Sequence, residues 1–433
     1  MIHCRGARLL AVLLCAFTLS GVPATAFAQP AGPPARFIVV LHDDVDALAV
    51  AREHANAHAL AVSHVYESAL KGYAAAIPAA RLPLILADPR VLFVSDDRPV
   101  SAVAQTLSTG VNRIDADQSS TLAGNGSGSI GVPVAIIDTG IDVGHPDLNV
   151  AGGKNCQNGP SYSDGNGHGS HVAGTVGARD NGSGVVGVAP GTPLYAVRVL
   201  NNAGSGSWSS VICGINWVTA NAAGLGIKVA NMSLGGGGAD DGNCGNTNSD
   251  ALHKAICGSV AAGITYVVAA GNDNVNFSGF VPAAYNEVLT VTAMADFNGI
   301  PSGGAAATCR ADVDDTAADF SNYTTPASLD AAHTIAAPGV CIFSTWKSGG
   351  YNTISGTSMA SPHVAGTVAL CLARSVAFGG CAGAGLSPAG IIAKLRTDAQ
   401  LYLATHLFYG FTGDPGLPIG SRYYGYLIYA GGY

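Results

Sequence analysis

The sequence predicts an α/β protein with a mostly parallel sheet and helices on both faces. From residue 111 onward, continuous apolar runs alternate with helical stretches. Such runs are typical of parallel strands buried on both faces, and the alternation is typical of βαβ units. The expected strands are 132–137, 194–200, 227–234, 264–270 and 288–293, and the expected helices are 170–178, 209–222, 250–262 and 358–372. A helix at 387–398 and an edge strand at 423–429 are expected to close the chain.

A small α+β module is expected before this unit, at residues 35–103. Its pattern gives strands at 37–41, 72–77 and 91–94 and helices at 45–60 and 79–86. This order suits a ferredoxin-like, split βαβ domain. Residues 101–110 are small and polar, a composition typical of an exposed boundary, so the larger unit is expected to cover 104–433.

Residues 1–28 have the three parts of a secretory signal peptide. Arg5 and Arg8 supply positive charge, 9–19 is apolar, and Ala26-Phe27-Ala28 is a small-x-small cleavage pattern. The apolar run is much shorter than the ~20 residues that span a bilayer. We therefore expect a secreted, extracellular protein that does not remain in the membrane.

Composition argues against several other classes of protein. The formal net charge is −8 and no block of Lys or Arg occurs, so nucleic-acid binding is not expected. The run Gly126-Ser127-Gly128-Ser129-Ile130-Gly131 fits a dinucleotide fingerprint by letters. It precedes a strand instead of following one, which removes the geometry that cradles phosphate.

The cysteines indicate disulfides. Removal of Cys4 and Cys15 with the signal leaves eight of the ten cysteines, an even number in an exported chain. No closely spaced Cys-x-x-Cys pair occurs, which argues against a zinc site. Spacing alone leaves the connectivity open.

One candidate nucleophile is Ser358, between a Gly-Thr turn and an apolar helical run. Pro362 is expected in the first helical turn, where proline is tolerated. Free N–H groups and the helix dipole at such a terminus favour developing negative charge. The alternative interpretation is an ordinary N-cap serine on a core helix.

Three more residues follow the expected strands or open a helix. Asp138 ends the first strand, Asn272 follows the strand at 264–270, and His168 opens a helix between glycines that leave room for the imidazole. Strand carboxyl ends are where catalytic groups collect in open α/β sheets. Each residue alone also has a structural interpretation, as a cap, a turn or a packed histidine. A zinc site at His168 and His171 lacks a third ligand.

Together these residues form a recognisable set. Asp138-Thr139-Gly140, the run His168 to Gly174, and Gly356 to Pro362 resemble the three active-site motifs of the subtilisin-like serine proteases, nearest to the proteinase K-like secreted members. The resemblance implies that Ser358 is the nucleophile, His168 the general base and then acid, Asp138 its orienting carboxylate and Asn272 an oxyanion donor.

The resemblance also implies a cleft that binds extended peptide backbone. Its walls would include Leu200, Gly204, Gly206, Ser233, Leu234 and Gly235, with the pocket floor near 279–284. No cofactor is needed for the chemistry, while structural calcium is an open question. Asp296 resembles a calcium ligand position, and a calcium site within 298–319 competes with a solvated acidic loop, which we favour because the spacing does not fit a calcium loop.

The disulfide pairs favoured from the sequence are Cys244–Cys257 and Cys371–Cys381, which are close in the chain, and Cys309–Cys341, which would tie down the 298–319 span. Cys156–Cys213 then remains.

We expect a monomeric serine endopeptidase that acts on protein or peptide substrates and is made as a self-processing zymogen. Its own propeptide would inhibit it until the chain is cut within 97–105. A catalytically inactive, binding-only relative is the alternative, although all four chemical positions are filled. An α/β-hydrolase esterase does not fit, because it needs Gly-x-Ser-x-Gly and the order Ser…Asp…His.

Overall fold

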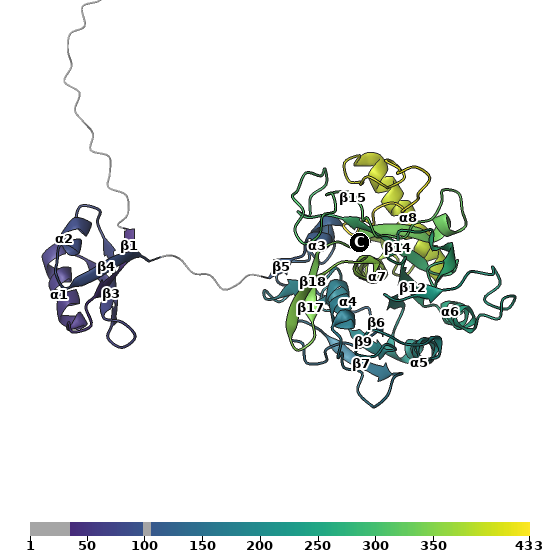
Figure 1. The fold of residues 1–433 in the computed structure, drawn as a ribbon, viewed down its shortest axis with the longest axis horizontal. Coiled ribbons are helices and arrows are strands. Elements are labelled where there is room, and N and C mark those ends of the chain that lie inside the picture. The colour runs from purple at the N-terminus through teal and green to yellow at the C-terminus, as the bar shows by residue number, and fades with distance from the viewer. Residues whose placement is uncertain (1–34, 98–104) are drawn as a thin grey trace, which may run out of the picture. The chain divides into compact units, whose positions relative to one another are not determined.

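The computed structural model describes residues 35–97 and 105–433, which belong to two compact units (Figure 1). The expected signal peptide at 1–28 and most of the expected cleavage segment lie outside the described residues.

The first unit is a four-stranded antiparallel sheet with two helices on one face. The strand order is β2-β3-β1-β4, which is the ferredoxin-like arrangement of two interlocked split βαβ units. Strand β2 was not expected from the sequence. Ser63 and His64 interrupt its apolar pattern, and a bulge lies between Val62 and His64. Its elements are β1 (Ala35–Leu41), α1 (Ala47–His58), β2 (Ala61–Tyr66), β3 (Gly72–Ile77), α2 (Leu82–Leu86) and β4 (Val91–Asp96).

The second unit is built on an eight-stranded sheet. Seven strands run parallel in the order β16-β14-β12-β10-β6-β9-β7, and β15 pairs antiparallel with β14. The strands of this sheet are β6 (Val134–Asp138), β7 (Val150–Asn155), β9 (Leu194–Arg198), β10 (Val229–Met232), β12 (Thr265–Ala269), β14 (Leu289–Ala295), β15 (Thr316–Ala317) and β16 (Thr334–Pro338). The chain leaves β6 toward β7 and β9 on one side of the sheet and leaves β10 toward β12, β14 and β16 on the other side. A topological switch point therefore lies between β6 and β10.

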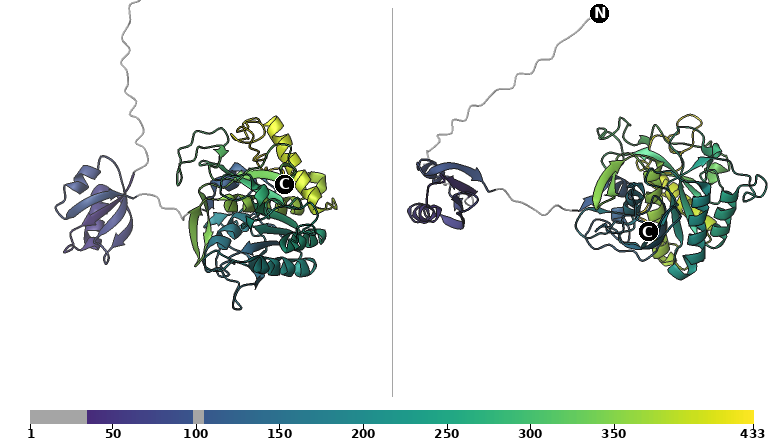
Figure 2. Two further views of the ribbon diagram at one scale, coloured as in Figure 1. Left: turned by 45° about the vertical axis from the view of Figure 1, so that its right-hand side comes forward. Right: turned by 60° about the horizontal axis from the view of Figure 1, so that its bottom comes forward.

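Helices cover both faces of this sheet, as expected (Figures 1 and 2). Helices α5 (Trp208–Leu225) and α6 (Ala251–Ala261) share one hydrophobic core with the sheet. The other face packs against α4 (His168–Gly177), α7 (Thr357–Ala373) and α8 (Pro388–Thr405). Residues 359–371 of α7 are buried on every side, the pattern of a helix in the middle of a core. No described helix is long and apolar enough to cross a membrane.

Short elements complete the second unit. They are β5 (Thr106–Leu107), which pairs in parallel with β8 (Val185–Val186); β11 (Gly236–Gly237), which pairs with β13 (Phe280–Val281); the hairpin of β17 (Ile342–Trp346) and β18 (Gly350–Ile354); and α3 (Thr109–Arg113).

The prediction of an edge strand at 423–429 is wrong. This segment makes only isolated bridges, Thr324 with Tyr423 and Ala336 with Leu427, and is otherwise irregular. Strands β7 and β16 were missed, because Gly152, Gly153 and Lys154 dilute the apolar pattern of the first and Ile335 is the one large apolar residue of the second.

The described residues form four disulfides, which join the same pairs that the sequence favours: Cys156–Cys213, Cys244–Cys257, Cys309–Cys341 and Cys371–Cys381. Cys371, which lies in α7, and Cys381 are buried in the core, whereas Cys309 is exposed.

Three of the four acidic residues of the 298–319 span are buried and only Asp319 is exposed, which corrects the interpretation as a solvated loop. Asp312, Asp314 and Asp315 are all buried. Asp314 accepts hydrogen bonds from the backbone N–H groups of Phe297 and Ala305, and Asp312 accepts from Arg310. A buried carboxylate needs such partners, so these side chains shape the segment from inside.

Candidate active site

The catalytic candidates gather at the carboxyl ends of the central strands. Asp138 is the last residue of β6, Ser233 follows β10, and Asn272 follows β12. His168 and Ser358 are the first and second residues of α4 and α7. The site therefore lies beside the switch point, where ligands bind in open α/β sheets.

Asp138 and His168 form a hydrogen-bonded pair. His168 Nδ1 lies 2.8 Å from Asp138 Oδ1, with the aspartate fully buried and the imidazole 24% exposed. Asp138 Oδ1 also accepts from the N–H of Thr139. Burial opposes protonation of His168, but the charge and hydrogen bond of Asp138, together with the charge of Asp164, raise the pKa of His168 above its ordinary value. His168 is thus a base whose protonated form is stabilised by Asp138 and Asp164.

The start of helix α4 is fixed by the Asp164 carboxylate and by close packing against the Gly140 main chain. Asp164 accepts from the N–H groups of Gly167 and Ser170, which have no partner inside the helix. A Cβ on Gly169 would lie 2.1 Å from the carbonyl oxygen of Gly140. Gly169 is therefore needed because two backbone segments approach closely here. The sequence predicts that this glycine leaves room for the imidazole, but it does not predict the backbone contact. Asp164 was not singled out from the sequence, because Asp-Gly-Asn resembles any polar turn.

Ser358 and Ser233 exchange hydrogen bonds. Ser358 Oγ donates to the carbonyl of Ser233 at 3.2 Å, and Ser233 Oγ donates to the carbonyl of Ser358 at 2.8 Å. His168 makes no hydrogen bond to Ser358 among the described residues; catalytic hydrogen bonds are often long before substrate binds. Ser233 Oγ is itself oriented by the buried Asn231, whose Nδ2 donates to it at 3.0 Å.

Pro362 explains why the second bond exists. It lies inside α7, four residues after Ser358, and not in the first turn as expected. Proline lacks the N–H that would bond to the Ser358 carbonyl. Ser233 Oγ fills that vacancy, so the helix interruption is satisfied by the strand-end residue across the cleft.

Asn272 is fixed through its oxygen. Its Oδ1 accepts from the N–H of Thr357 at 2.8 Å and from Thr357 Oγ1 at 2.9 Å. The amide nitrogen is left available beside Ser358, and both residues line one cavity of about 240 Å³. An amide donor next to the first N–H groups of a helix is a geometry suited to an oxyanion.

A larger cavity of about 680 Å³ holds the expected peptide cleft. It is lined by Leu200, Gly204, Gly206, Ser233, Leu234 and Gly235, together with His168 and other residues including Trp208. The smaller cavity continues from Leu234 and Gly235 to Phe280. Of the expected floor at 279–284, Phe280 alone is among the lining residues; Val281, Ala283 and Ala284 are buried in the core.

Asp296 is a poor candidate for calcium. Its carboxylate is buried and lies 3.2 Å from Nε of Arg113, a fully buried arginine that also pairs with Asp315 and donates to the carbonyl of Tyr409. Burial raises the pKa of Asp296 to about 7, against the hydrogen bond from Gly299 and the charge of Arg113. A guanidinium already occupies the place beside this carboxylate where a cation would bind.

An Asp–His pair and a helix-terminal serine at the edge of a parallel sheet define the class of serine hydrolases that cut acyl bonds. Comparisons with known proteins make this specific. Residues 129–411 match the subtilase family. Subtilisin DY of Bacillus licheniformis is 42% identical over 276 residues, 63% of this chain and 86% of that protein. Subtilisin E of Bacillus subtilis is 37% identical over 330 residues, 75% of this chain and 74% of that protein.

A solved structure of a cold-adapted subtilisin-like serine proteinase is 31% identical, with a TM-score of 0.54, and covers 74% of this chain and 97% of that one. The chain belongs to the subtilase family. It is a serine endopeptidase, as the sequence motifs indicate.

Proposed function

We propose that this endopeptidase works through Ser358 as nucleophile, His168 as general base and acid, Asp138 as the carboxylate that orients His168, and Asn272 as oxyanion donor. The observation that carries the proposal is the 2.8 Å contact between His168 Nδ1 and Asp138 Oδ1. A carboxylate accepts only, so this contact places the proton on Nδ1 and leaves Nε2 free to accept one.

In the proposed reaction, Ser358 Oγ attacks the carbonyl carbon of the scissile bond while Nε2 of His168 takes its proton. The carbonyl oxygen becomes an oxyanion that accepts from Asn272 Nδ2 and the N–H of Ser358. His168 then protonates the leaving amine as the C–N bond breaks, which leaves an ester on Ser358. Water, deprotonated by His168, cleaves this ester, and the proton returns to Ser358 Oγ.

Substrate is proposed to bind as an extended strand between the segments around Gly204–Gly206 and Ser233–Gly235. Exposed main-chain groups in these segments would pair with the peptide backbone, as in strand addition. The pocket that ends at Phe280 would accept the side chain before the cut bond, because it opens directly beside Ser358.

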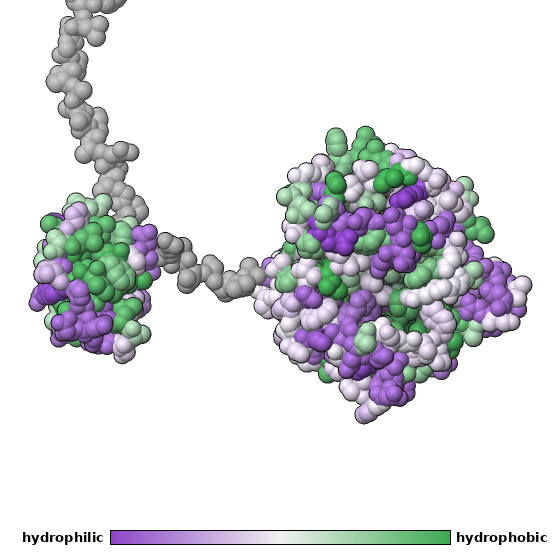
Figure 3. Space-filling view, viewed as in Figure 1, coloured by the Kyte–Doolittle hydropathy of each residue, from purple (hydrophilic) through white to green (hydrophobic). Residues whose placement is uncertain are grey.

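We further propose export and activation by self-cleavage within 97–105, with 35–97 as the core of an inhibitory propeptide. On the sheet face away from the helices, Ile38 and Val40 alternate with the core residues Val39 and Leu41, and Phe93 beside Val40 is 51% exposed. Hydrophobic residues are also visible on the side of this unit shown in Figure 3. Apolar surface of this kind marks an interaction site.

The test is Ser358→Ala. This variant should lack peptidase activity and accumulate as an uncut precursor, seen as one longer band beside the processed wild type. Mature-length Ser358→Ala protein from a host without other proteases would contradict self-processing. Residual activity of this variant would contradict the assignment of the nucleophile.

Calcium binding is common in subtilases, and we propose a calcium site where Gln105 meets the 179–185 loop. The carbonyls of Arg179 and Val185 converge on the Gln105 amide, at 2.5 and 2.8 Å from Nε2, and the neighbouring Asp147 carboxylate contacts Asn181. Turning the amide over would bring a third neutral oxygen to this point, and Ca²⁺ prefers such oxygen sets. Chelation should lower the Tm of wild type but leave the Tm of Gln105→Ala unchanged.

A further inference from the structure

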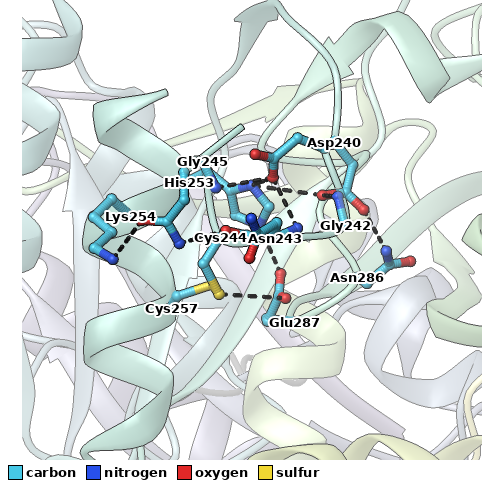
Figure 4. Close-up of a disulfide and its surroundings, with 12 residues drawn as sticks. Asp240, Gly242, Asn243, Cys244, Gly245, His253, Lys254, Cys257, Asn286 and Glu287 are labelled. Atoms are coloured by element: carbon cyan, nitrogen blue, oxygen red, sulfur yellow. Dashed lines mark hydrogen bonds and ion pairs between the residues drawn. A yellow bond between two sulfur atoms is a disulfide. The ribbon is translucent and has the colours of Figure 1, made fainter. Parts of the chain in front are cut away.

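A second cluster of charged side chains lies around His253 on α6, away from the catalytic residues. His253 is fully buried, although it carries two polar nitrogens. It lies within the loop and helix segment that the Cys244–Cys257 disulfide closes (Figure 4). Three carboxylates surround its ring, from Asp240, Asp241 and Glu287.

One ring nitrogen has a clear partner. His253 Nε2 lies 2.9 Å from Glu287 Oε2 with hydrogen-bond geometry, and the ring stacks on Tyr285 at a centroid distance of 4.0 Å. Because a carboxylate accepts only, Nε2 carries the proton. Glu287 therefore fixes both the orientation of the ring and its tautomer.

The other nitrogen faces only acceptors. His253 Nδ1 lies 3.2 Å from Asp241 Oδ1 and 3.5 Å from Asp240 Oδ1, yet neither contact has hydrogen-bond geometry, and Nδ1 is buried without a hydrogen-bond partner. A lone pair held against two carboxylates in a buried site is repulsive. A positive charge between the three atoms would remove this repulsion.

The distances favour a metal ion over a proton. Zinc binds imidazole nitrogen and carboxylate oxygen at about 2.0–2.2 Å, so two ligand atoms on one tetrahedral ion are roughly 3.3–3.5 Å apart. The two contacts of Nδ1 are close to this separation, and the ligand atoms of the three residues all lie within 4.8 Å of one another. A hydrogen bond from a protonated Nδ1 would be shorter and aligned.

We propose that Nδ1 of His253, Asp240 and Asp241 bind a divalent transition metal of the zinc class, with Glu287 as the carboxylate that orients the histidine. Such carboxylate–histidine–metal arrangements are usual around metal sites. Both aspartates are held in place: Asn286 donates to Asp240, and the backbone N–H groups of Gly245 and Thr247 donate to Asp241. Cys244 and Cys257 contribute no thiolate, because they are joined to each other.

The site would connect three segments beside the peptide cleft. Asp240 and Asp241 follow β11, which pairs with β13, while His253 lies on α6 and Glu287 precedes β14. Gly235, directly before β11, and Phe280, in β13, both line the cleft, so the ion would stiffen one wall of it. The proposed role of the ion is structural, because none of its three protein ligands is among the catalytic residues.

The test uses full-length chain carrying Ser358→Ala, stripped with a chelator and titrated with Zn²⁺ alone. It should bind one more Zn²⁺ per chain than the same protein with His253→Gln, and Co²⁺ in place of zinc should give the intense visible absorption of tetrahedral coordination. Glu287→Gln should weaken binding about 10–100-fold without abolishing it. His406→Gln, which changes an exposed histidine outside the cluster, should bind like the parent.

Asp240→Asn is a second variant for the case that His253→Gln does not fold, because Asp240 is on the loop and its side chain is partly exposed. It should also lose the extra ion. Equal zinc binding in the parent and in Asp240→Asn would overturn the proposal. So would a parent that binds no zinc, or nitrogen NMR that shows both ring nitrogens of His253 protonated in the presence of Zn²⁺, since a proton would then be the positive charge.

Discussion

Ser233 donates to the carbonyl of Ser358 because Pro362 cannot. Ser233→Ala should therefore leave a partly buried carbonyl without this partner, which costs up to about 3 kcal/mol of unfolding free energy. In a Pro362→Ala background the N–H of residue 362 can donate instead, so the same change should cost less. A double-mutant cycle by urea unfolding, with Ser358→Ala to prevent self-digestion, measures this coupling. Equal costs in both backgrounds would show that the two residues act independently.

Asn272 should matter for turnover far more than for substrate binding. Asn272→Ala is expected to lower kcat by about a hundred- to a thousand-fold with little change in KM, the range for loss of one oxyanion donor. Asn272→Asp keeps an oxygen for Thr357 while it removes the donor and adds negative charge. It should be at least as inactive as the alanine variant. Steady-state kinetics on a peptide substrate tests both, and an active Asp variant would refute the donor role.

The pH dependence of kcat/KM should report His168. Its pKa is raised above 6.5, so the protonated form is favoured in the folded enzyme. The raised pKa stabilises the folded enzyme at pH values below the unfolded pKa of His168, and this stability is lost as pH rises through the folded pKa. Activity needs the neutral base, so kcat/KM should rise through the same pH window.

Asp164→Asn removes one negative charge that raises this pKa, so the acid limb of the profile should move to lower pH. Asp319→Asn, which removes an exposed charge paired with Arg310, serves as the control and should leave the limb in place. An unshifted limb in Asp164→Asn would mean that the carboxylate acts only as the cap of α4.

Arg113 should be important for stability. Arg113→Met keeps much of the volume but leaves Asp296 and Asp315 buried without their cation. Breaking a buried pair by removing one partner costs about 3–5 kcal/mol. Lys394→Met provides the comparison, because Lys394 pairs with Asp398 one turn along α8 and both side chains are partly exposed, so its loss should cost under about 1 kcal/mol. Urea unfolding of both variants would decide, and equal destabilisation would contradict the difference in burial.

Much of the fold could be predicted because the central strands are mostly apolar. The apolar runs around 134–138 and 265–269 were correctly predicted as buried strands, and residues at their ends were predicted as the site. Prediction failed where local sequence is neutral. Strand β7 contains two glycines and a lysine, and tertiary pairing alone makes it a strand.

The parts of the site that prediction missed act across the fold. The bond between Ser233 and Ser358 joins residues 125 positions apart, and Asp164 meets Thr139 and α4 from a turn. Arg113 lies 202 positions from Asp315. Periodicity and spacing describe neighbours along the chain, so they contain no signal for these partners. The motifs indicate the candidate residues, while the hydrogen bonds that support them join segments that meet only in the folded chain.

Gly169 has a consequence for how this enzyme can change. Its Cα approaches the Gly140 carbonyl so closely that a single methyl group would have to displace main chain on one side of the catalytic pair. Gly237, on β11, has open space around its missing Cβ. A mutational library should thus be depleted of every substitution at position 169 and tolerant at 237. Selection for new substrates can therefore add a side chain at Gly237. It cannot add one at Gly169 without changing the spacing between Asp138 and His168.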